Sequence, residues 1–303
     1  MAVVINTNVD ALKIQSLLNS STNKMSSSMQ RMSSGLKILS AKDDAAGTVI
    51  SAKMQVQLNG NKIAQTNVQN ANALLSTAEG NLDVIQDNMT RIRDLTLQAK
   101  NGTYSSDELS AMQAEVTQRM KEIDRINLSA EYSSLRLFGG TELAGGATFQ
   151  VGADYGESNT ISTGTTLFEE VNFSAMTGVE VDDFSLSGFN KSSKATFTDK
   201  PDGLDSIDDC KNDFDVAIKA LDAAITKITD KKSEIGSVGN RMDSALSTLT
   251  TQYENLSSAK SIITDADVAA EASNFTQQQI LQQVSTSLLA QANQAPSIAL
   301  SLV

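Results

Sequence analysis

The longest regular pattern in the sequence is a row of apolar residues spaced alternately three and four apart, from Ile207 to Ile263. Only Lys231 and Gln252 interrupt this row. A 3.5-residue repeat held over such a length predicts a helix that packs as a coiled coil. At 1.5 Å per residue, this helix would be on the order of 80 Å long, which a compact globular domain would not use.

Two shorter rows of the same kind lie on either side of Asn101-Gly102, a dipeptide typical of a turn. Ser105 or Ser106 can cap the second helix, because acidic residues follow in its first turn. The pattern therefore predicts an antiparallel helical hairpin formed by residues 45–100 and 107–126.

The middle of the chain, about residues 139–204, has a different composition, rich in Gly, Ser, Thr and Asp. Short runs of alternating apolar and polar residues are separated here by glycines, a pattern typical of β-hairpins. These runs are residues 147–151, 179–181, 184–186 and 194–197. The fold class expected is thus mainly α, a long antiparallel coiled-coil or bundle rod with paired terminal helices and a small central β region.

The two ends of the chain each carry one apolar stripe at helical spacing, opposite a face of Ser, Asn, Gln and Thr with few charges. A single amphipathic helix is marginally stable in water, but two from opposite ends can pair. Their uncharged outer faces are easily desolvated, which predicts that the ends become buried in a polymer and are poorly ordered in isolation. The expected polymer contacts are Leu18, Met25, Met29, Met32, Leu36, Leu281, Val284, Leu288, Ile298 and Leu302.

The composition excludes several classes of function. Lys and Arg number 24 against 36 Asp and Glu, so the net charge is −12, and the pI near 4.5 argues against nucleic-acid binding. The chain has no His and one Cys, Cys210, which removes His-dependent catalysis, internal disulfides and Cys-rich metal sites. We therefore expect neither an enzyme nor a bound metal or cofactor.

Four features have both a chemical and a structural interpretation. Asp43-Asp44 could be a catalytic or metal-binding pair, but no other ligand accompanies it, so a helix start or linker is favoured. The Gly236–Gly239 segment resembles part of a phosphate-binding loop, yet it lies inside the long row, which favours close helix packing or a bend. Cys210 could have a redox role, and the methionines of the N-terminal stripe could form a binding groove or a copper site. Their positions on rows of apolar residues favour apolar core contacts instead.

No segment has the roughly 18–20 uninterrupted apolar residues that span a bilayer, so we expect no membrane insertion. The N-terminus lacks the basic and apolar regions of a cleaved secretory signal. The sequence still allows export by a route that does not depend on such a signal.

Motifs at both ends of the chain resemble those of bacterial flagellin, the subunit of the flagellar filament. The resemblance covers about residues 1–151 and 205–303. The matching segments are MAVVINTN at 1–8, MSSGLKI at 32–38, SAKDDAAG at 40–47, RIRDL at 91–95, QAEVTQR at 113–119, QILQQ at 279–283 and LAQANQ at 289–294.

The resemblance implies that residues 1–42 and 264–303 form an inner core domain and residues 43–263 an outer rod domain. Residues 33–47 would link the two, and the large outer domains of longer flagellins would be missing or reduced to a small excursion near residues 171–197. The resemblance also implies type III export to an extracellular bacterial flagellum used for motility. The implied partners are further copies of the chain, an export chaperone, the filament cap and hook-junction proteins.

Arg91 and Leu95 lie four residues apart, beside the row of apolar residues rather than in it, so we expect both to be accessible. Glu115 lies beside the apolar row of the next helix. The simplest interpretation is an ordinary surface that contacts a neighbouring subunit. By resemblance, these three positions match those contacted by the vertebrate Toll-like receptor for flagellin.

Three alternatives remain, one a structural protein of the same class and two from other classes. A hook–filament junction protein would share the terminal motifs but would leave a long filament when its gene is deleted. A non-flagellar coiled-coil adaptor would be an ordered, soluble rod with a charged surface. An enzyme is disfavoured because the chain has no His and because no group of polar residues is placed to form an active site.

Overall fold

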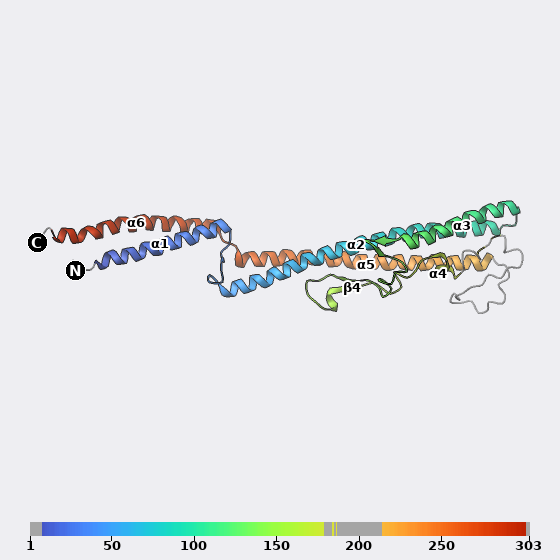
Figure 1. The fold of residues 1–303 in the computed structure, drawn as a ribbon, viewed down its shortest axis with the longest axis horizontal. Coiled ribbons are helices and arrows are strands. Elements are labelled where there is room, and N and C mark those ends of the chain that lie inside the picture. Colours follow the sequence, from blue (N-terminus) through green and yellow to red (C-terminus); the bar gives the residue numbers. More distant parts are fainter. Residues whose placement is uncertain (1–7, 179–183, 185, 187–213, 301–303) are drawn as a thin grey trace. The chain divides into compact units, whose positions relative to one another are not determined.

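The computed structural model describes residues 8–178, 184, 186 and 214–300, with residues 295–300 described by backbone alone. Long helices dominate the described chain, and they flank two small pairs of strands (Figure 1). This confirms the expected fold class. The helices are α1 (Val9–Ser34), α2 (Ala45–Lys100), α3 (Ser106–Ser129), α4 (Phe173–Thr177), α5 (Phe214–Thr264) and α6 (Val268–Leu300). The strands are β1 (Glu131–Tyr132), β2 (Leu135–Arg136), β3 (Thr148–Gln150) and β4 (Thr160–Ser162), with the 3₁₀ turn η1 (Glu157–Asn159) before β4.

The chain divides into two compact units. One contains Met1–Asn59 and Gln252–Val303, and the other contains Gly60–Thr251. The helices α2 and α5 each pass from one unit into the other. The predicted division at residues 42 and 264 describes roles in an assembled filament, so it stays a prediction.

The core of the second unit is built on the predicted hairpin of α2 and α3, with α5 packed beside it. The rows of apolar residues predicted from the sequence are buried here, because each helix turns one face toward its partners. Large apolar side chains of α2 and α3 that are fully buried are Leu82, Ile85, Met89, Ile92, Met120 and Ile123.

The turn between α2 and α3 ends in the cap that the sequence predicted. Ser105 Oγ accepts a hydrogen bond from the Glu108 amide at 3.4 Å, and Glu108 Oε2 accepts one from the Ser105 amide at 2.7 Å. The amide and then the hydroxyl of Ser105 donate to the Glu108 carboxylate, and these two hydrogen bonds lower the pKa of Glu108 below its usual value. Such reciprocal capping satisfies backbone donors at the helix start and fixes where α3 begins.

Two features of the central region differ from the prediction. A hairpin of β1 and β2 lies just before the predicted window, and its turn residues Ser133 and Ser134 have φ of 50° and 67°. Tight hairpin turns with positive φ are usually recognised in a sequence by Asn-Gly or Asp-Gly, so the Ser-Ser turn did not predict this hairpin. The helix α4 inside the window was also not expected.

The predicted run at 147–151 is confirmed by β3, which pairs antiparallel with β4. The runs at 179–181 and 194–197, part of the run at 184–186, and Cys210 lie outside the described residues.

Polar side chains of α3 hold the segment that contains α4 through its backbone. Asn127 Oδ1 and Asp124 Oδ1 accept hydrogen bonds from the amides of Val171 and Phe173, both at 3.0 Å. Farther along, Gln113 donates to the Phe184 carbonyl at 2.8 Å. The segment is therefore fixed by specific hydrogen bonds as well as by apolar packing.

Lys231, which interrupts the longest apolar row, is 8% exposed and donates to the carbonyl oxygens of Thr166 and Leu167. Burial lowers its pKa below the usual value for lysine. Lys231 therefore interrupts the apolar row because its buried side-chain nitrogen provides hydrogen bonds to carbonyl oxygens of the loop.

The prediction of close helix packing at Gly236 and Gly239 was wrong, whereas the alternative, a local bend, stays a prediction. A Cβ added at either glycine would meet no atom within 4 Å apart from nearby helix backbone. Both glycines line an open hollow of about 260 Å³ between α2 and α5. A phosphate-binding loop is also inconsistent with their position inside the α5 helix.

Candidate functional site: the paired terminal helices and their junction

The helices α1 and α6 run side by side in opposite directions (Figure 1). Near one end of the pair, Asn8 Nδ2 donates to the carbonyl of Ala292 at 2.8 Å. Midway, Ser21 Oγ donates to the carbonyl of Gln278 at 2.9 Å. Ser21 is 6% exposed, and so small a side chain lets the two backbones approach closely. Polar contacts therefore set the register of this pair.

The predicted N-terminal stripe contributes in part to the pairing. Leu18, Met25 and Met32 are half-buried, whereas Met29 is 55% exposed and Leu36 is 39% exposed. Some of the stripe thus covers α6, and the rest faces outward in this single chain.

The predicted C-terminal stripe does not face α1. Leu281, Val284 and Leu288 are 44%, 48% and 45% exposed. Each comes directly before a half-buried position of α6, and those positions are Gln282, Ser285 and Leu289. One residue is a rotation of about 100° around a helix, so the stripe lies to one side of the paired face. Ile298 has no described side chain, and Leu302 lies outside the described residues.

A short junction connects each terminal helix to its longer neighbour. Gly35 ends α1 with φ of 71°, a conformation that favours glycine. The Lys37 amide then donates to the Thr264 carbonyl at 2.7 Å, and the Ala266 amide donates to the Gly35 carbonyl at 2.9 Å. These hydrogen bonds hold the two connecting segments, residues 35–44 and 265–267, against each other.

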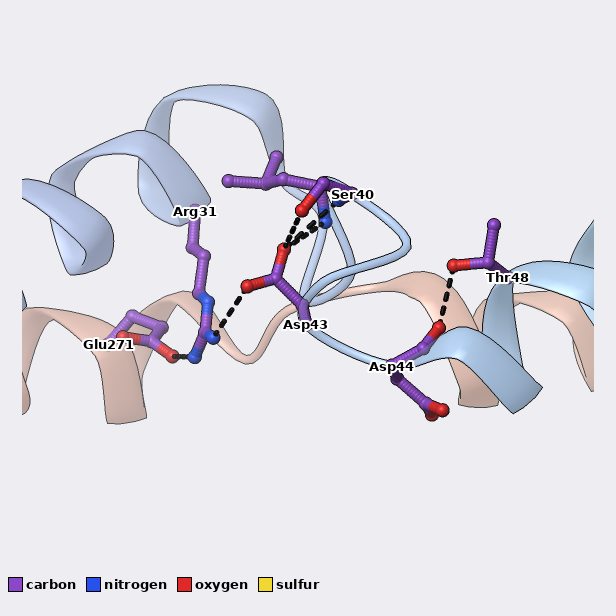
Figure 2. A network of polar contacts seen from close by, with 7 residues as sticks. Arg31, Ser40, Asp43, Asp44, Thr48 and Glu271 are labelled. Atoms are coloured by element: carbon purple, nitrogen blue, oxygen red, sulfur yellow. Dashed lines mark hydrogen bonds and ion pairs between the residues drawn. The ribbon is translucent and has the colours of Figure 1, made fainter.

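Asp43 and Asp44 have structural roles in this junction, as the sequence favoured (Figure 2). Asp43 Oδ2 accepts hydrogen bonds from the amide and hydroxyl of Ser40 at 3.0 and 3.1 Å. Asp44 Oδ1 accepts from the Gly47 amide at 2.9 Å and caps the first turn of α2. Among the residues that the structure describes, no cluster of acidic, Cys or His side chains could hold a metal ion.

Arg31, in the last turn of α1, joins the loop to α6 (Figure 2). Its guanidinium lies 3.3 Å from Glu271 and 4.0 Å from Asp43. Hydrogen bonds from Ser40 lower the pKa of Asp43, and hydrogen bonds from Ser28 and then Arg31 lower the pKa of Glu271. Sequence reasoning missed Arg31 and Glu271 as partners, because 240 residues separate them.

Acid should loosen this junction. Both carboxyls have pKa values below their ordinary 3.8 and 4.5, so their contribution is complete above those values. It is lost as the pH falls through the lowered values of the folded chain. Asp43→Asn at pH 7 should imitate protonation of that carboxyl and speed tryptic cleavage at Lys37, whose own neighbours in the sequence are unchanged. Cleavage as slow as in the matched control Asp10→Asn would contradict this expectation.

A second polar cluster links α2 and α3. Arg91 Nε and Arg119 Nε each lie 3.0 Å from Glu115 Oε1, and Arg119 also donates to Asn88 at 3.1 Å. A hydrogen bond with Glu115 raises the pKa of Arg91, and one with Arg91 lowers the pKa of Glu115. The structure thus brings together two of the three predicted receptor-contact residues on an accessible surface.

The expected accessibility of Leu95 was wrong. Leu95 is 3% exposed and belongs to the core of the second unit. The prediction assumed that α2 packs with a single row of apolar residues against one other helix. Because α2 contacts both α3 and α5, a wider face of the helix is buried. Ion pairs of Arg93 with Asp222 and of Lys100 with Asp215 mark the contact with α5.

Comparison with known proteins identifies the family. Residues 5–143 match the model of the bacterial flagellin N-terminal helical region, and residues 218–303 match that of the C-terminal helical region. Flagellin from Xenorhabdus nematophila is 37% identical over the full length of both chains. The chain belongs to the bacterial flagellin family. Flagellin from Bacillus subtilis strain 168 is 34% identical over 99% of each chain.

The fold has a counterpart among solved structures. A protein of Vibrio parahaemolyticus described as flagellar hook-associated superposes with a TM-score of 0.55. The match covers 73% of this chain and 99% of that one at 16% identity, which supports the likeness of fold alone.

Membership of the flagellin family fixes the general function. The chain is a structural subunit that polymerises with copies of itself into the extracellular flagellar filament, and it is not an enzyme. None of the described helices is long and apolar enough to cross a membrane.

Proposed function

We propose that the subunit assembles by burying the exposed stripe of α6 against further copies of the chain, with ordering of both termini during assembly. The observation that carries this proposal is the half-exposure of Leu281, Val284 and Leu288 on a helix that already has a partner. Three large apolar residues at helical spacing form a surface that a single chain leaves in contact with water.

The energetics favour cooperative assembly. Burial stabilises by about 25 cal/mol per Å² of apolar surface. Ordering the backbone costs about 1–2 kcal/mol per residue. One interface cannot offset that cost for two whole helices, so several neighbours must contribute at once. The uncharged Gln, Ser and Asn residues beside the stripe lower the desolvation cost of these contacts.

Amide hydrogen exchange of monomer and filament tests this proposal. Amides of α1 and α6 should exchange quickly in dilute monomer and be protected by at least about a hundredfold after seeded polymerisation. The buried α2–α3 hairpin should be protected in both states, and it serves as the internal reference. Equal protection of α1 and α6 in monomer and filament would overturn the coupling of assembly to ordering.

In this proposal, residues 1–42 and 264–303 form the inner core of the filament, and 43–263 form its outer part. The subunit passes through a type III export channel and joins the filament beneath a cap protein, above hook-junction proteins. Before export, the exposed stripe of α6 suits an export chaperone, because its apolar residues need shielding from water.

We also propose that Arg91 and Glu115 contact the vertebrate Toll-like receptor for flagellin when the chain is monomeric. Both side chains are accessible on one surface, at 47% and 36% exposure. The burial of Leu95 means that it supports this surface from inside rather than touching a receptor.

A further inference from the structure

The sequence contains two Asn-Gly dipeptides, Asn59-Gly60 and Asn101-Gly102, in different structural settings. We infer that Asn101 is a site of spontaneous deamidation and that Asn59 is protected from it. This modification needs no enzyme or cofactor, since the only co-reactant is water. The flanking backbone decides whether it occurs.

The turn after α2 leaves Asn101 open to this reaction. Asn101 and Gly102 are both exposed, and Asn101 follows the last residue of α2. Apart from its chain neighbours, no atom lies within 4 Å of the position that a Cβ at Gly102 would occupy, so the turn is not crowded by other parts of the chain. Within the described part of the chain, the Gly102 amide donates no hydrogen bond.

The carbonyl of Asn101 also favours the reaction. It accepts a hydrogen bond from the Thr103 amide at 2.6 Å, which closes a three-residue turn around Gly102. A hydrogen bond to a carbonyl oxygen draws electron density from the attached nitrogen. The Gly102 amide therefore loses its proton to hydroxide more readily.

The chemistry balances without an oxidant or reductant. The deprotonated Gly102 nitrogen attacks Cγ of Asn101. The Nδ2 amino group takes up a proton from water, the Cγ–Nδ2 bond breaks, and the group leaves as ammonia while hydroxide is regenerated. Water then opens the resulting succinimide at either of its carbonyl groups. One opening gives aspartate and the other gives isoaspartate, and the net change is the replacement of an amide by a carboxylate.

Asn59 has the same neighbour but lies inside α2. There the Gly60 amide is held in the helical hydrogen-bond ladder, and the helical backbone keeps it away from Asn59 Cγ. The Asn59 side chain is also engaged, since its Oδ1 accepts from Gln55 at 2.8 Å. Asn59 is thus a built-in control for the effect of structure on the same dipeptide.

The modification would change the charge of an exposed turn. Each event adds one negative charge to a chain whose formal net charge is −12. The new carboxylate would be adjacent to Lys100, whose ammonium pairs with Asp215 of α5. A subunit outside the cell would accumulate this mark with age.

Mass spectrometry of the folded full-length chain tests the inference. After incubation at 37 °C and neutral or alkaline pH, the protein is digested with pepsin in acid, which stops further deamidation. The Asn101 peptide should convert to aspartate and isoaspartate forms at least about tenfold faster than the Asn59 peptide, a difference of about 1.4 kcal/mol in barrier. The rate should rise with pH, and ¹⁸O from labelled water should enter the product.

Gly102→Ala is the matched variant, because the turn has space for the added methyl group. A side chain beside the attacking nitrogen should slow ring closure, because it restricts the backbone angles that the nitrogen needs to reach Cγ of Asn101. The variant should slow conversion of Asn101 while leaving helical content unchanged by circular dichroism. Deamidation of the unfolded chain in denaturant should bring the two sites to similar rates. Equal rates at Asn59 and Asn101 in the folded chain, or no effect of Gly102→Ala, would overturn the inference.

Discussion

Filaments should form only at higher subunit concentration when Leu281 and Leu288 are both replaced by glutamine, while the helical content of the monomer should not change. Both leucines are nearly half exposed in the single chain, so their loss costs the monomer little. Assembly would bury only the part of each leucine that is still exposed, so each contributes about half of the 1.5–3 kcal/mol expected for complete burial. The double change should therefore raise the critical concentration for polymerisation by about tenfold or more.

Seeded polymerisation followed by sedimentation and negative-stain microscopy measures this effect, and circular dichroism checks the monomer. Gln283→Ala is a suitable control, because Gln283 is exposed on α6 but lies outside the stripe. An unchanged critical concentration for the double variant would mean that the stripe faces water in the filament, and the proposed mode of assembly would fail.

Leu95→Ala should destabilise the second unit by about 2–5 kcal/mol, because it leaves a cavity between packed helices. Replacing the exposed pair Arg91 and Glu115 by alanine should change the free energy of unfolding by only about 0–1 kcal/mol. Chemical denaturation of the monomer distinguishes the two variants. A Leu95→Ala chain as stable as the parent would contradict the burial of Leu95 in the core.

The same variants separate receptor contact from folding. Replacing Arg91 and Glu115 should reduce Toll-like receptor signalling by about tenfold or more, because both are accessible charged groups. The exposed pair Glu122 and Arg125 on α3 offers a matched control that keeps the cluster intact. Full signalling by the Arg91 and Glu115 variant would dismiss the proposed receptor surface, whatever Leu95→Ala does.

The sequence alone determined the long helices and their buried faces. The repeat of apolar residues in α2, α3 and α5 is a local property, since any helix with that period turns the same side chains inward. Ser105, Asp44 and Gly35 end or begin helices through hydrogen bonds or backbone angles within a few residues. Such features can be recognised without knowing the rest of the fold.

Only the tertiary structure decided which faces meet. The contact of Ser21 with Gln278 and of Arg31 with Glu271 joins residues more than 200 positions apart, and no local pattern marks polar side chains as partners. The third helix beside α2 likewise decided that Leu95 is buried. The hydrophobic effect favours covering an apolar stripe, but it has no preferred direction. Which partner covers the stripe therefore depends on how the whole chain packs.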